Sequence, residues 1–193
     1  MFRIRLEINS IELDRVKRHW NLYFVFYTEH PDHPDQNVIA VIPRDRMINF
    51  RRPTDNTYSF RPEGKHTEGL FVLERDMPED RSVKARLWVM HSHEAMHSIA
   101  EIMGEVNGMF GGKGVREVVR ALGGDLWLTM GRTAAEIGEK FLRAMDDRSL
   151  GFVSMDEHFS PVEIKSGELQ RNNKLTTGFA EISWSWKISG QDD

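Results

Sequence analysis

Hydrophobic and polar residues alternate near both ends of the chain, and this period of two constrains the fold more than any other feature. In residues 2–8 the apolar side chains are separated by arginine and glutamate, and in residues 182–188 by serine and lysine. Such alternation predicts strands with one face in a core and the other in solvent. Short apolar runs predict six further strands, at residues 21–28, 38–42, 69–75, 83–90, 150–153 and 162–164.

The segments between these strands carry turn and loop signals. Residues 11–19 are charged and are interpreted as a connection. Prolines interrupt residues 29–35, and Pro78 lies among acidic residues in 76–80, so both are expected to be loops. Residues 171–174 contain two asparagines, which tolerate left-handed backbone angles, and this predicts a tight turn.

The middle of the chain changes to helical spacing. From Ser92, a possible helix cap, one side of a predicted helix carries Ala95, Ile99, Ile102, Met103 and Val106. A shorter helical stripe is expected at 115–122, and a capping box at Thr133 and Glu136 begins a third helix.

Strands, then helices, then strands predict an α+β fold that is mainly β. We expect one domain over residues 1–193, in which 1–91 and 147–193 form an antiparallel β-sandwich. Residues 92–146 are interpreted as a helical subdomain inserted into it.

Composition excludes several classes of protein. The formal net charge of −4 argues against a nucleic-acid partner. The absence of cysteine excludes disulfides, thiol nucleophiles and thiolate metal sites. The N-terminus lacks the apolar run of a secretory signal, and no stretch has the roughly 18 apolar residues of a spanning helix. We therefore expect a soluble protein, cytoplasmic by default.

One catalytic motif is present, His93-Glu94-Ala95-Met96-His97. An HExxH helix places two histidines one turn apart, so that both can bind one zinc while the glutamate acts as base toward metal-bound water. Glu101 extends the same stripe and is a candidate third ligand. The motif is similar to that of the zincin metallopeptidases, which implies a zinc-dependent hydrolase.

The chain departs from the longer motifs of those enzymes. The extended metzincin form needs glycine and then histidine after the second His, where this chain has Ala100 and Met103. His93, His97 and Glu101 also lie on the charged side of the predicted helix. The sequence therefore favours a solvated helix face over a catalytic zinc, with an adventitious surface metal site as a further alternative.

The loop at 29–35 is a second candidate metal site. Glu29, Asp32 and Asp35 supply hard oxygen ligands on a proline-framed turn, which suit calcium, although no EF-hand spacing is present. A solvated acidic loop is the simpler interpretation. If calcium does bind there, the loop would attach the protein to membranes.

The favoured hypothesis is a non-enzymatic β-sandwich binding module without a cofactor. It would act through self-association, a protein partner or a membrane surface. The aromatic strand at 182–188 and the Gly/Met-rich predicted helices would supply the contact area. The zinc hydrolase and the calcium-dependent membrane module remain the alternatives.

Overall fold

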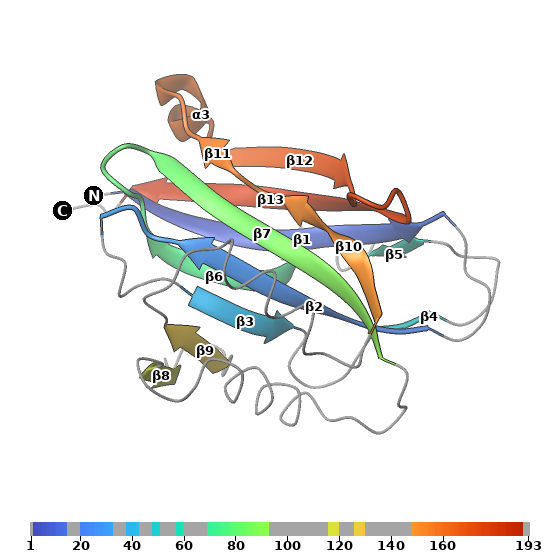
Figure 1. Cartoon of the computed structure of the whole chain (residues 1–193). Helices are drawn as coiled ribbons and strands as arrows, with labels where there is room; N and C mark the ends of the chain where they lie inside the picture. Colours follow the sequence, from blue (N-terminus) through green and yellow to red (C-terminus); the bar gives the residue numbers. More distant parts are fainter. Residues whose placement is uncertain are drawn as a thin grey trace.

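The described residues form mostly β-strands, arranged as two antiparallel sheets that pack against each other in a sandwich-like arrangement (Figure 1). The structure is a computed structural model. It describes residues 2–14, 20–32, 38–42, 48–50, 57–59, 69–92, 116–119, 126–129 and 148–190.

The first sheet joins the two ends of the chain. Its strand order is β12–β13–β1, and the remaining edge of β1 is shared by β5 and β6. Because β1 and β13 pair along their whole length, neither flank of the sequence can build this sheet alone. Its strands are β1 (Phe2–Leu13), β5 (Thr57–Ser59), β6 (Leu70–Asp76), β12 (Glu168–Lys174) and β13 (Ala180–Gly190).

The second sheet has the order β10–β7–β2–β3–β9–β8. Two short strands lie off this path: β11 pairs with β7, and β4 pairs with β2. Its strands are β2 (Trp20–Glu29), β3 (Val38–Ile42), β4 (Ile48–Phe50), β7 (Ser82–Ser92), β8 (Arg116–Val119), β9 (Leu126–Thr129), β10 (Arg148–Ser154) and β11 (Glu157–His158).

The core lies between the sheets, and the sequence periodicity predicts the four strands that contribute most of it, although β1 is longer than predicted. The inward residues of β1, β2, β7 and β13 are almost fully buried, and each large side chain contributes roughly 1.5–3 kcal/mol by leaving water. The outward side chains of β2 are also buried, as expected for residues 21–28 with two apolar faces. The inward set includes Ile4, Leu6, Ile8, Leu22, Phe24, Phe26, Val83, Ala85, Leu87, Val89, Ile182, Trp184, Trp186 and Ile188.

The prediction that a connection begins at residue 11 is wrong, because β1 continues to Leu13. A register shift between Ile8 and Ser10 inserts one extra residue opposite β13. After this bulge Ile11 and Leu13 point into the core, as Ile4, Leu6 and Ile8 do before it. The bulge breaks the alternation in the sequence, and the strand is therefore longer than the pattern indicates.

The helical stripe predicted for 115–122 is wrong over residues 116–119, which form β8. This strand pairs with β9, and β9 pairs with β3, so the second sheet extends into the predicted helical insertion. Two adjacent valines favour a strand as well as they fit a short helical stripe. Apart from β8 and β9, residues 93–147 lie outside the described part of the chain, and so do the helices predicted after Ser92 and from Thr133.

Two predictions near the C-terminus are also wrong. Residues 162–164 belong to a helix, α3 (Pro161–Ser166), and not to a strand. Residues 171–174 lie within β12, where they pair with 181–184 of β13. The turn comes later and contains Gly178, whose φ of 73° lies in the left-handed region.

Candidate functional site

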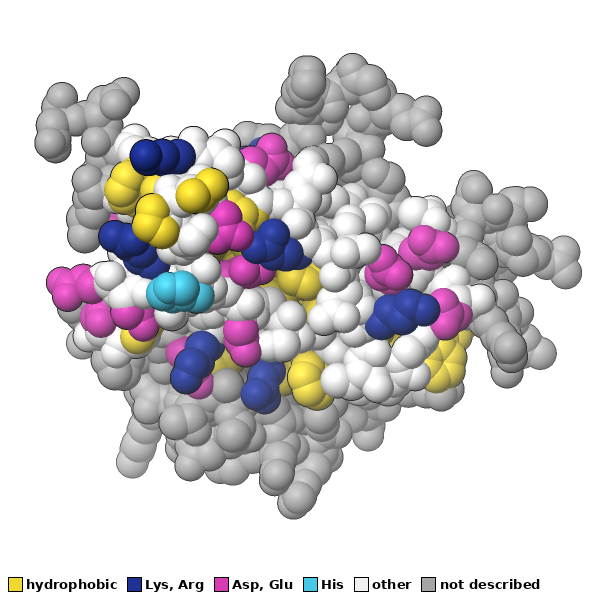
Figure 2. All heavy atoms as spheres, turned by 90° about the horizontal axis from the view of Figure 1, so that it is seen from above, with side chains coloured by type: hydrophobic (Ala, Val, Ile, Leu, Met, Phe, Trp, Pro, Cys, Tyr) yellow, Lys and Arg dark blue, Asp and Glu magenta, His cyan; other side chains and the backbone are white. Residues whose placement is uncertain are grey.

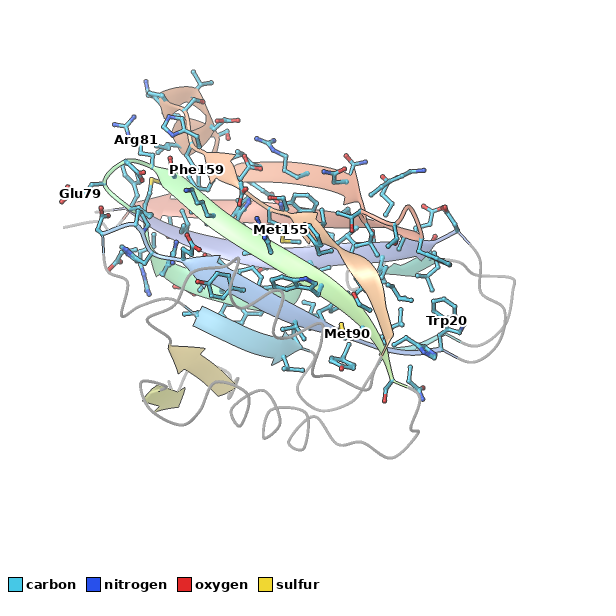
Figure 3. All side chains as sticks on the ribbon, in the orientation of Figure 1. Trp20, Glu79, Arg81, Met90, Met155 and Phe159 are labelled. Carbon is cyan, nitrogen blue, oxygen red and sulfur yellow. The ribbon has the colours of Figure 1, made fainter. Side chains whose placement is uncertain are left out.

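Three connections between strands meet at one end of the sandwich, at the left of Figure 1. They are residues 29–32 after β2, residues 76–81 between β6 and β7, and residues 157–168, which include α3. We call this the α3 end. Asp32 Oδ2 accepts a hydrogen bond from Glu79 N at 3.3 Å, and Phe159 N donates to Arg81 O at 2.9 Å. Figure 3 shows Glu79, Arg81 and Phe159 at this end.

Local sequence explains why α3 forms at the surface. The Ser160 hydroxyl accepts from Glu163 N, and the Glu163 carboxylate accepts from Ser160 N, which completes a capping box. Pro161 at the first turn has no N–H that would need a partner. Gly167 ends the helix with a φ of 76°, and its carbonyl accepts from Ile188 N at 2.7 Å. Both ends of this short helix are therefore fixed.

An arginine on β12 fixes α3 from the side. Arg171 Nε lies 2.9 Å from Glu157 Oε1, and Arg171 Nη2 lies 3.1 Å from Glu163 Oε1. The hydrogen bonds from Ser160 lower the pKa of Glu163, and the contact with Arg171 lowers it further. The hydrogen bond to Glu157 is the main cause of the raised pKa of Arg171. Both ionic partners are thus held in the charged form at neutral pH.

The outer surface of α3 presents an apolar side chain to solvent. Val162 is 76% exposed, while Ile164 packs against the core. Figure 2 shows hydrophobic side chains gathered at this end, among basic and acidic side chains and a histidine. Exposed charged residues of both signs surround it: Glu79, Asp80, Arg81, Lys165 and Glu168.

Beneath the turns, Arg75 lies buried between the two sheets. It is the penultimate residue of β6 and pairs with Ile4, so its side chain points to the core side of the sheet. Its Nη2 donates to the carbonyl of Glu29 at the end of β2, at 2.8 Å. Burial lowers the pKa of Arg75 to about 10, and the negative charge of Asp32 opposes that shift.

The structure places two of the three predicted calcium ligands at the α3 end. Of Glu29, Asp32 and Asp35, the first two are described and the third lies outside the described residues. The Asp32 carboxylate accepts the hydrogen bond from Glu79, and the Glu29 carbonyl accepts from Arg75. Within the described ranges, no group of three His, Asp or Glu side chains is arranged to hold a metal ion.

Three other acidic residues near this end of the sandwich contact strand residues. Asp156 Oδ1 accepts from Ala85 N, Asp80 Oδ1 accepts from Ser82 N, and Asp76 lies 3.7 Å from Arg3. Calcium binding remains an untested prediction.

The HExxH motif lies outside the described residues. Ser92, predicted to cap its helix, is the last residue of β7 and is buried. His93, Glu94, His97 and Glu101 follow it and are not described, so the zinc hypothesis stays a prediction.

Sequence reasoning missed the features that organise the α3 end. Ser160 and Glu163 have the spacing of a capping box, and Gly167 follows at the distance expected for a short helix, so this signal was available. Arg75 gives no comparable signal, because a charged residue at the end of a strand is ordinarily solvated.

Comparison with protein-family models and with curated proteins finds no match to this chain. Of the helices in the described ranges, none is long and apolar enough to cross a membrane.

Proposed function

We propose that this protein is a non-enzymatic binding module of the β-sandwich type, and that its α3 end binds a protein partner. The observation that carries the proposal is the exposure of Val162 on a helix that is fixed at both ends and from the side. Because the helix that carries this apolar side chain is already ordered, binding a partner does not cost the free energy of ordering it, which favours binding.

The surrounding charges favour a protein partner over a lipid surface. Attachment to anionic lipid relies on clustered lysine and arginine, worth about 1 kcal/mol each near the surface. At the α3 end, Arg81 and Lys165 are balanced by exposed acidic residues. A small apolar centre inside a mixed polar rim is typical of a protein–protein contact.

The expected contribution of Val162 follows from its exposure. Complete burial of a valine side chain is worth about 1.5–3 kcal/mol, and 76% of this surface is still available to a partner. Covering it would therefore contribute about 1–2 kcal/mol, which is roughly a 5- to 30-fold change in affinity. An aspartate at this position would have a larger effect, because its charge would be desolvated.

The test begins with photo-crosslinking in cells. A photoreactive residue is placed at 162 and, as a matched control, at Lys174, an exposed position at the far end of β12. We expect one protein to be captured from 162 and not from 174. That protein, purified, should bind the wild type and Lys174→Asp with equal affinity, and Val162→Asp at least about tenfold more weakly.

Three outcomes would contradict the proposal. The first is unchanged affinity of the captured protein for Val162→Asp. The second is capture of a second copy of the chain, with sedimentation showing a dimer that Val162→Asp dissociates; this would establish self-association instead. The third is pelleting with phosphatidylserine-containing vesicles that Val162→Asp abolishes, which would establish a membrane surface as the target.

The Gly/Met-rich helices predicted within 92–146 would enlarge the contact surface under the same hypothesis. They lie largely outside the described residues, so their part in binding remains a prediction. A crosslinker placed at Met103 tests this prediction, since capture of the same partner from positions 103 and 162 would show that both belong to one interface.

A further inference from the structure

Arg75 is a buried cation whose hydrogen-bonding capacity is mostly unused. Arg75 is 8% exposed, and among the described residues it bridges the two sheets through one hydrogen bond, from Nη2 to Glu29 O. A guanidinium carries five N–H donors in a planar fork. Within the described part of the chain, its Nε and Nη1 have no hydrogen-bond partner.

This arrangement differs from that of an ordinary buried arginine. A buried arginine is normally paired with a carboxylate, because an isolated charge is costly to remove from water. Among the residues that the structure describes, no carboxylate forms an ion pair with Arg75. The charge nevertheless persists at neutral pH, since the pKa of Arg75 is lowered only to about 10. An apolar side chain of similar length would fill the same space without this cost.

The position of Arg75 allows a small ligand to approach. It lies one residue from the end of β6, and its partner Glu29 is the last residue of β2, so it is at the rim of the layer between the sheets. The turns above it are joined by the exposed hydrogen bond from Glu79 N to Asp32. This hydrogen bond is exposed and contributes little to stability by itself.

The neighbouring charges select the kind of anion. Asp32, Glu79 and Asp80 lie in those turns and would repel a doubly charged phosphate more strongly than a singly charged group. A carboxylate is planar and matches the donor fork of a guanidinium. We propose that Arg75 anchors a binding site for one carboxylate group at the α3 end, supplied by a small organic acid or by the C-terminus of a peptide.

The site is tested with acetate as the probe. Thermal unfolding is followed while acetate replaces chloride at constant ionic strength, because a ligand that binds only the native state raises Tm. We expect Tm to rise for the wild type and for Arg81→Met, an exposed arginine at the same end. Arg75→Met should lose the response, which corresponds to at least about a tenfold weaker affinity.

A second measurement does not depend on the variant. The Nε–H resonance of Arg75 in the wild-type protein should shift with acetate and saturate, and the Arg81 resonance should not. Equal Tm responses in the wild type and Arg75→Met, or an Arg75 resonance that does not move, would overturn the proposal. A larger response to phosphate than to acetate would contradict the assignment to a carboxylate.

The two sources of the carboxylate are distinguished by one further comparison. A tripeptide with a free C-terminus is titrated beside its amidated form. Tighter binding of the free form than of acetate identifies a peptide terminus, and binding of acetate alone identifies a small acid. Val162→Asp should leave the acetate response unchanged, so this site and the partner contact can fail separately.

Discussion

Replacing Glu7 by glutamine should destabilise the protein much more than the same change at a neighbouring carboxylate. Glu7 is on β1 and is fully buried. Its Oε1 lies 2.8 Å from Arg5 Nε, and its Oε2 lies 2.9 Å from Lys187 Nζ and accepts from Gly69 N at 2.9 Å. One carboxylate thus joins β1, β13 and the residue before β6.

The magnitude follows from the partners that glutamine retains. Its amide oxygen can keep the Gly69 bond at the Oε2 position, and its amide NH₂ then faces Arg5. Charge-assisted hydrogen bonds contribute about 1.5–3 kcal/mol against about 0.5–1.5 for neutral ones. Because two cations are affected, the free energy of unfolding should fall by about 2–3 kcal/mol. The decrease is limited because Arg5 and Lys187 are 27% and 34% exposed and can turn toward water. In a protein of this size that corresponds to roughly 5–10 °C in Tm.

Urea unfolding of Glu7→Gln and Glu74→Gln measures the difference. Glu74 is the matched control because it also forms an ion pair in the first sheet, with Arg3 at 3.0 Å, but both partners are about one-third exposed. Such pairs contribute about 0–1 kcal/mol. If the free energies of unfolding of the two variants differ by less than about 0.5 kcal/mol, the reasoning from burial is refuted.

Four further predictions concern other parts of the chain. The folded state lowers the pKa of Glu163, so the ionised carboxylate stabilises α3 fully above the ordinary value of 4.5, and this stabilisation is lost as pH falls through the lowered value. The carboxyl ¹³C chemical shift of Glu163 should therefore titrate below pH 4.5, and a midpoint at or above 4.5 would contradict this. Gly69→Ala should destabilise by more than about 1 kcal/mol, because the new Cβ would lie 2.5 Å from a carbonyl of β1, and an unchanged urea midpoint would refute it. If the chain is a zinc hydrolase, purified protein holds about one zinc and Glu94→Gln abolishes hydrolysis without unfolding; metal-free protein of full stability removes that alternative. Calcium-dependent attachment through 29–35 predicts vesicle pelleting that a chelator abolishes, and equal pelleting with and without chelator ends the hypothesis.

The accuracy of the sequence predictions depended on how many structures a local pattern could fit. Alternation at 182–188 fits only a strand with one buried face, and β13 has that form. Residues 115–122 fit a helical stripe or a strand, and pairing with β9 settled residues 116–119 as a strand. Two asparagines at 172 and 173 suit a turn, yet they lie within β12, because the partner strand β13 extends that far. Local preference was overruled wherever a partner strand was available.

The candidate site was less predictable than the fold. The capping box at Ser160 is a local signal and could have been found. The burial of Arg75 depends on its position opposite Ile4 and on the approach of Glu29 from the other sheet. No spacing in the sequence encodes that approach.

Local sequence is sufficient to show which faces of the long strands are apolar, one in β1, β7 and β13 and both in β2, since the period of two is a property of the extended backbone. It also determined the capping of α3 and excluded thiol chemistry. The pairing of the strands, the position of the bulge in β1 and the burial of Glu7 and Arg75 depend on tertiary packing. Burial of a charge depends on atoms that come from distant parts of the chain, and a local pattern does not indicate which distant residues become neighbours.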